Sequence, residues 1–147
     1  MGSHYDGTEE EVRALSAFIN LSRAANALAA EHARRLTTHG LTLTQFGVLE
    51  ALYHLGPMPQ KDLGRRTLKT SGNMTVVIEN LVRMGHVQRD RRSDDRRFIA
   101  VTLTKAGKKL IGDMLADHVA GVVRDMEPLT TEEQDQLRRM CRLIGRK

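Results

Sequence analysis

Apolar side chains recur every three or four residues along most of the chain, which predicts a mainly helical protein. The first such stretch, 8–39, carries apolar side chains on more than one face. A helix of that kind needs cover from more than its own small domain, so we expect part of it to form a subunit interface. Further helical patterns follow over 42–55, 61–68, 71–84, 104–127 and 130–145.

Helix starts are marked by hydroxyl residues followed three positions later by Glu or Gln. This capping-box spacing occurs at Thr8 with Glu11, at Thr42 with Gln45, and at Thr130 with Glu133. In such a pair the hydroxyl and the carboxylate or amide each bond a backbone amide of the first turn. We therefore expect three helices to begin at these positions, and a further helix to begin after the threonine at 104.

Two short helices joined by a tight polar turn, over 61–68 and 71–84, have the pattern of a helix-turn-helix. The second helix opens with small polar residues, which would allow its first turn to enter a DNA major groove. Asn73 is the candidate for a base edge, since an amide both donates and accepts, as adenine requires. Lys69, Thr70 and Ser71 suit backbone contacts, although Thr70 and Ser71 also suit a simple helix cap. The expected contact set is completed by Met74 and Thr75.

The pattern changes to period two over 87–103, with a highly charged centre. Residues 89–97 hold five arginines and three aspartates, and Ile99, Val101 and Leu103 then alternate toward one side. This predicts a β-hairpin with a cationic tip. Acids in the spacing Asp90-x-Arg92-x-x-Asp95-x-Arg97 would form cross-strand ion pairs that hold selected guanidinium groups in place. A solvated, salt-bridged hairpin without a ligand remains the alternative.

The net charge of +5 is concentrated in one segment. Between 60 and 97 there are ten Lys and Arg against five Asp and Glu, whereas the rest of the chain holds 13 of each. A basic centre between neutral flanks is typical of a nucleic-acid-binding core inside a dimerisation frame.

Other functional classes find little support in the chain. No Gly-rich phosphate loop, nucleophile triad or pair of catalytic carboxylates stands out, and no two of the six histidines have zinc-site spacing, so we expect no enzyme, no metal and no cofactor. No apolar run is long enough for a membrane span, and no secretory leader is visible. The single cysteine, Cys141, fits passive packing in a reducing cytoplasm, with redox sensing as the alternative. Residues 1–7 fit a disordered tag remnant.

With these motifs in place, the chain resembles the MarR family of winged helix-turn-helix regulators from residue 8 onward. The resemblance rests on the wing pattern from Asp90 to Arg97 and on Leu103-Thr104-x-x-Gly107, which closes the wing. It implies a mainly α fold with a small β-hairpin wing. Within a single domain, 8–147, the winged-helix core 42–103 would be flanked by dimerisation helices, 8–39 and 104–147.

The resemblance also implies that the protein is a transcriptional regulator that acts as a repressor. It would bind, as a homodimer, a pseudo-palindromic site on double-stranded DNA, in the cytoplasm at the nucleoid. The wing would contribute Arg91, Arg92, Asp95, Arg96 and Arg97, with Arg96 or Arg97 entering a minor groove. A phenolic or anionic aromatic effector would bind beside Arg23, His39 and Phe46 and release the DNA. A winged-helix protein-interaction module and a non-specific architectural DNA binder remain alternative functions.

Overall fold

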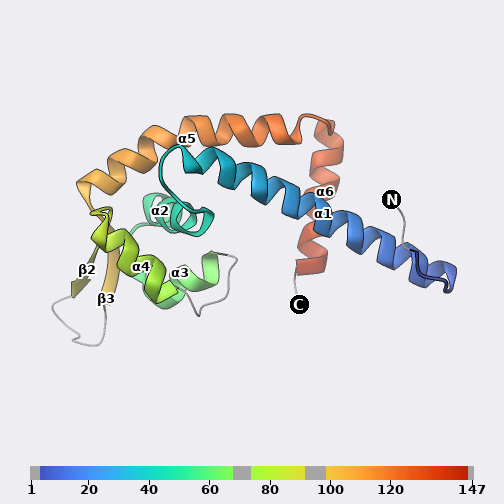
Figure 1. Cartoon of the computed structure of the whole chain (residues 1–147), viewed down its shortest axis with the longest axis horizontal. Coiled ribbons are helices and arrows are strands. Elements are labelled where there is room, and N and C mark those ends of the chain that lie inside the picture. Colours follow the sequence, from blue (N-terminus) through green and yellow to red (C-terminus); the bar gives the residue numbers. More distant parts are fainter. Residues whose placement is uncertain (1–3, 68–73, 92–98, 146–147) are drawn as a thin grey trace. The chain divides into compact units, whose positions relative to one another are not determined.

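The computed structural model describes residues 4–67, 74–91 and 99–145, and these form helices with one small antiparallel sheet (Figure 1). By contacts between backbones the chain divides into two compact units, Met1–Ile111 and Gly112–Lys147. The elements of the first unit are α1 (Glu9–Thr37), α2 (Leu43–Leu55), β1 (Met58–Pro59), α3 (Gln60–Arg66), α4 (Met74–Arg83), β2 (Val87–Arg91), β3 (Ile99–Leu103) and the start of α5 (Lys105–Met126). The second unit holds the rest of α5 and α6 (Thr131–Gly145).

All three predicted capping boxes are confirmed. At the start of α1 the Thr8 hydroxyl accepts from the Glu11 amide while the Glu11 carboxylate accepts from the Thr8 amide. Thr42 and Gln45 make the same reciprocal pair at α2, and Thr130 and Glu133 make it at α6. Each pair satisfies two amides that the first helical turn would otherwise leave unbonded.

The sheet has one strand more than the sequence analysis predicted. The hairpin of β2 and β3 is present, but β1 pairs with the other side of β3, so the described strands run in the order β1-β3-β2. Sequence patterns could not identify β1, because a strand of two residues, one of them proline, has no periodicity. Since β3 is the central strand, Ala100 and Val101 are both buried, whereas Ile99 is exposed.

The core of the first unit forms where α2, α3, α4 and the sheet meet. Its fully buried side chains come from every one of these elements and from the start of α5: Phe46, Val48, Leu49, Leu63, Ile78, Leu81, Val87, Val101 and Ile111. Burying side chains of this size stabilises a fold by about 1.5–3 kcal/mol each. This core therefore fixes α3, α4 and the hairpin relative to one another.

Candidate nucleic-acid interface

Helices α3 and α4 form the helix-turn-helix that the sequence predicted. Leu63 of α3 and Ile78 and Leu81 of α4 are fully buried, so each helix turns its polar side outward. Arg65 and Arg66 are exposed at the end of α3, as expected. The predicted contact residues Lys69, Thr70, Ser71 and Asn73 lie outside the described residues.

The first residues of α4 divide between the core and the surface. Met74 is only 4% exposed, so its side chain packs in the core and its assignment to the DNA-contact set is corrected. Its place in the apolar stripe with Ile78 and Leu81 is the reason, because residues four and seven positions apart share a helix face. Thr75 is exposed, and its hydroxyl accepts a hydrogen bond of 2.8 Å from the Gln60 side-chain amide.

Gln60 is a residue that the sequence analysis missed. It opens α3, fifteen positions before Thr75, and its bond joins the starts of the two helices. No local spacing indicates such a bond, since it exists only once α3 and α4 have packed. The bond fixes the direction in which the Thr75 side chain points from α4.

The wing is described at its base. In the β2–β3 ladder Arg89 lies opposite Val101 and Arg91 opposite Ile99, and both arginines are exposed. The Asp90 carboxylate accepts from the side chains of Thr102, at 3.2 Å, and Gln88, at 3.3 Å. The tip, with Arg92, Asp95, Arg96 and Arg97, lies outside the described residues, and so do the predicted ion pairs that involve it.

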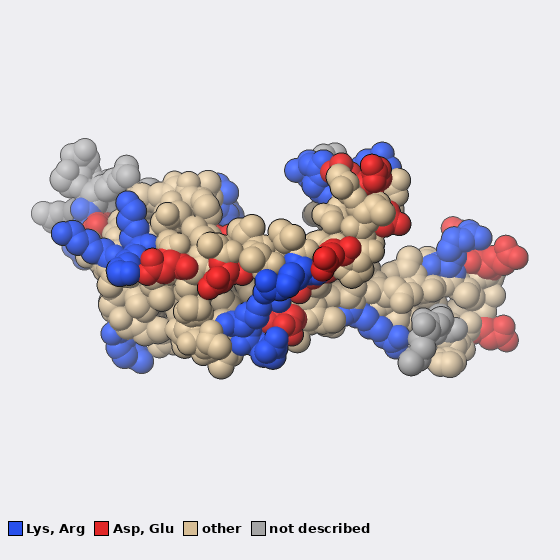
Figure 2. Space-filling model, turned by 90° about the horizontal axis from the view of Figure 1, so that it is seen from above, with Lys and Arg blue, Asp and Glu red and all other residues tan. Residues whose placement is uncertain are grey.

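Positive charge is concentrated on this lobe. Within 60–67 and 74–91 there are six Lys and Arg against three Asp and Glu. Figure 2 shows Lys and Arg side chains that project at the left end of the molecule, where Figure 1 places the base of the hairpin. A concentration of cations around an exposed helix attracts the phosphates of a duplex.

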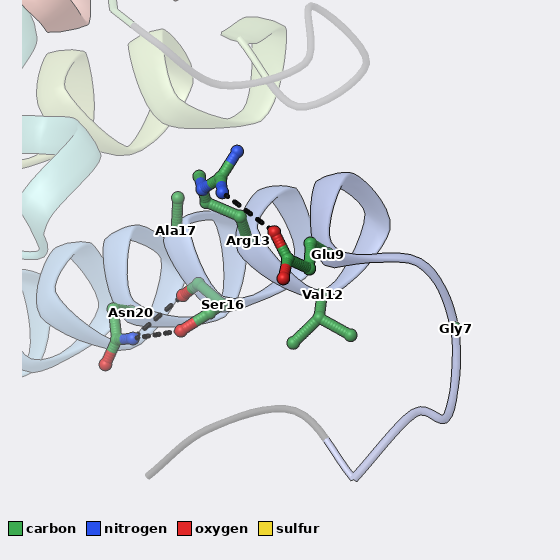
Figure 3. A pocket seen from close by; sticks show the side chains of 7 residues that line it. All are labelled: Gly7, Glu9, Val12, Arg13, Ser16, Ala17 and Asn20. Carbon is green, nitrogen blue, oxygen red and sulfur yellow. Dashed lines mark hydrogen bonds and ion pairs between the residues drawn. The ribbon is translucent and has the colours of Figure 1, made fainter.

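A pocket of about 660 Å³ follows the first turns of α1. Figure 3 shows its lining, in which Arg13 pairs with Glu9 and the Asn20 side chain donates to the backbone oxygen and the hydroxyl of Ser16. Val12 and Ala17 contribute the apolar part of the surface. All of the lining lies within residues 7–20, so this is a groove along one helix and its lead-in.

A larger pocket, of about 920 Å³, lies between α1, α2 and the end of α3. Its walls are mostly apolar, and Phe46 meets His32 edge-on with ring centroids 5.4 Å apart. Its charged and ionisable side chains include His54 and Arg66, which an anion could approach, and Glu50, which adds a carboxylate. Of the three residues that the sequence analysis placed beside an effector crevice, Phe46 lines this pocket, whereas Arg23 and His39 do not.

The described residues contain no group of three or more His, Cys, Asp or Glu side chains placed to hold a metal ion. Among the helices of residues 4–67, 74–91 and 99–145, none is both long enough and apolar enough to cross a membrane. Cys141 is exposed on α6.

Comparison with known proteins gives a consistent result. The model of the MarR family matches residues 39–97, which cover α2, the helix-turn-helix and the first strand of the wing, β2. The chain is 35% identical to the uncharacterized HTH-type transcriptional regulator YkoM of Bacillus subtilis over 130 residues, 88% of this chain and 84% of YkoM.

Solved structures give the same fold. Sco3205, a MarR family regulator from Streptomyces coelicolor solved in complex with DNA, aligns with a TM-score of 0.84 at 20% identity over 97% of this chain and 91% of that chain. The Mycobacterium tuberculosis MarR family protein Rv2887, solved with salicylic acid, aligns with a TM-score of 0.67 at 29% identity over 85% of this chain and 93% of that chain. The helix-turn-helix, the wing and these similarities together establish that the chain belongs to the MarR family of DNA-binding transcriptional regulators.

Proposed function

We propose that this regulator is a repressor that binds, as a homodimer, a pseudo-palindromic operator through α4 and the wing of each protomer. The observation that carries the proposal is the exposed face of α4, which stands on a fixed core and is flanked by the cations of α3 and β2. A recognition helix of this kind reads base edges, while the surrounding Lys and Arg neutralise phosphates. Such a protein would act in the cytoplasm, at the nucleoid.

Exposed apolar side chains on the helices outside the DNA-binding lobe support the homodimer. The large apolar residues that are exposed on these helices are Leu15 and Phe18 on α1, Val119, Val122 and Val123 on α5, and Met140, Leu143 and Ile144 on α6. Apolar surface of this extent marks an interface with another protein. The charges suit a second copy: the first turn of α1 is acidic, with Glu9, Glu10 and Glu11, whereas the second half of α6 carries Arg138, Arg139 and Arg142.

The 920 Å³ pocket supports control by a small aromatic acid. Its apolar walls would take a ring, and Arg66 would meet a carboxylate, because guanidinium groups bind carboxylates strongly. The related protein Rv2887 has been solved with salicylic acid, which has this chemistry. Since the pocket wall includes the last residues of α3, a ligand there would favour one position of the helix-turn-helix over another.

Selection from a random duplex pool tests the proposed function. We expect bound fragments to share a palindromic motif whose half-sites are centred about one helical turn, roughly 10 base pairs, apart. Salicylate should then weaken binding to the selected site. Binding without enrichment of any motif would indicate an architectural DNA binder. Absence of binding even at low salt would indicate a protein-interaction module. Either result would overturn the proposal.

A further inference from the structure

The exposed side of α4 contains a residue that neither the sequence analysis nor the family resemblance singled out. The buried side of this helix is formed by Met74, Ile78 and Leu81, which pack toward α2, α3 and β2. Thr75, Val76 and Glu79 are exposed on the other side in its first two turns, and Val82 and Arg83 are exposed nearer its end. Because a recognition helix enters the groove by its N-terminal end, the first three residues belong to the surface that would face the bases.

Val76 stands out on this surface because it is apolar. Its side chain is 53% exposed, in the first turn of α4 as described, next to a residue that is tied to α3. An isolated valine elsewhere on a surface would carry no meaning. At the start of a recognition helix, however, the exposed side chains are those that reach base edges in the major groove.

The bond between Gln60 and Thr75 helps to fix the direction in which the Val76 side chain points. Because the Thr75 hydroxyl accepts from Gln60 on α3, the first turn of α4 is held at its side as well as by the buried Met74. Valine itself has one strongly preferred side-chain rotamer in a helix. The two methyl groups of Val76 therefore project from α4 in a set direction.

We propose that Val76 reads the C5-methyl group of a thymine in each half-site of the operator. In the major groove, thymine is the base that displays a methyl group, and apolar side chains recognise it by contact. This inference rests on the proposed function, and it adds a base preference at one position. We therefore expect each half-site to contain a thymine that the protein recognises by its methyl group rather than by its hydrogen-bonding edge.

The surroundings of Val76 favour a duplex over a protein partner. Five exposed cations lie on the neighbouring elements: Lys61, Arg65 and Arg66 on α3, and Arg89 and Arg91 on β2. A protein-docking surface would group several exposed apolar residues, whereas Val76 has the polar Thr75 and Glu79 near it, and the exposed Val82 lies toward the other end of the helix. The charge around this face matches the phosphates of DNA.

Replacing thymine by deoxyuridine tests the proposal, since the change removes the methyl group and leaves base pairing intact. After selection of a bound motif, each thymine of a half-site is replaced in turn, symmetrically in both half-sites, and affinity is measured by fluorescence anisotropy. For the wild-type protein we expect one position at which the dissociation constant rises about fourfold per half-site, roughly 15-fold in all, as loss of one buried methyl group predicts. Val76→Ala should bind the thymine and deoxyuridine duplexes equally at that position.

Val82→Ala is the matched control, because Val82 is exposed at the other end of the same helix. It should keep the full sensitivity to deoxyuridine, and circular dichroism should show that both variants remain folded. Val76→Thr, which keeps the branched shape, provides a second folded variant and should lose part of the discrimination. The inference is overturned if deoxyuridine weakens binding equally in the wild type and Val76→Ala, or if it weakens wild-type binding at no position. Either result leaves the proposed function intact. Failure to select any motif overturns both.

Discussion

Gly107, in the first turn of α5, packs directly against the backbone carbonyl of His86, just before the wing. A β-carbon at position 107 would overlap the carbonyl oxygen of His86 and lie 2.8 Å from its carbonyl carbon. Thr104 joins the same contact: its amide donates to the His86 oxygen at 3.1 Å, and its hydroxyl donates to the Gly85 oxygen at 2.6 Å. The end of α4, the start of β2 and the start of α5 are thus held together at one point.

Gly107→Ala should destabilise the protein. Because the obstructing atom belongs to the backbone, the new methyl group can be accommodated only by a shift of α5 or of the residues before β2. Forcing extra atoms into a packed site costs about 1–3 kcal/mol, so we expect the free energy of unfolding in urea to fall by that amount. Binding to the selected operator should weaken as well, since the wing starts at this contact.

Gly145→Ala is the control for this change. Gly145 is also a helical glycine, and a β-carbon there would meet nothing within 4 Å. Alanine is the better helix former, so stability should stay the same or rise slightly. Equal losses in the two variants would mean that the contact with His86 is not the cause.

The sequence carried enough information to predict this junction, but not its geometry. Thr104 and Gly107 were recognised as a spacing that closes the wing, and the structure shows the reason: Thr104 bonds back to Gly85, and only glycine fits at 107. Capping boxes were equally predictable, since each bond lies within four consecutive residues. Local patterns of this kind can be identified from the sequence alone because they do not depend on tertiary packing.

Features that depend on distant segments were missed. Strand β1 exists because Met58 and Pro59 pair with Val101 and Ala100, some forty residues away. Met74 shares an apolar stripe with Ile78 and Leu81, and only the packed structure shows that its side chain is buried and unavailable as the DNA contact that we expected. The bond between Gln60 and Thr75 likewise has no local signature.

DNA affinity should depend steeply on salt. If a dimer contacts about eight phosphates, the slope of log affinity against log salt is about −7. Arg89→Gln, which removes an exposed cation from β2 in each protomer, should make the slope shallower by about 2. Arg34→Gln is the control, because Arg34 lies on α1 and is paired with Glu31. A slope near zero for the wild-type protein would contradict phosphate-driven binding.

The wing tip should contribute directly to affinity. Although Arg96 and Arg97 lie outside the described residues, the base of the hairpin holds the strands that lead to them in a fixed register. A guanidinium in a narrow minor groove meets a concentrated negative potential, so replacing either arginine by alanine should cost about 1–3 kcal/mol if that residue enters the groove. A gel-shift titration with each variant would identify which arginine enters; unchanged binding by both would contradict the wing model.

The pocket between α1 and α2 can be filled from within. Ala29 lines it, so Ala29→Leu should occupy part of its volume and abolish the rise in melting temperature that salicylate is expected to produce. Affinity for the selected operator without salicylate should not change. Ala30→Leu, at an exposed position on the same helix, should respond like the wild type. If Ala29→Leu kept the full response, salicylate would have to bind elsewhere.

Dimerisation should depend on the apolar surface of α1 and α5. Phe18 is 66% exposed and Val123 is 63% exposed, and burying such side chains in a second copy would remove a large apolar area from water. Phe18→Asp and Val123→Asp would each place a carboxylate, whose desolvation is costly, in that interface. By size-exclusion chromatography with light scattering, the wild-type protein should have twice the 16.5 kDa mass of one chain, and the variants should shift toward the monomer.

Tyr53→Asp is the control, because Tyr53 is exposed on α2, and this variant should remain dimeric. Because one protomer reaches only one half-site, the monomeric variants should also lose most of their preference for the palindrome over a random duplex; a monomeric variant that kept this preference would contradict the two-fold arrangement.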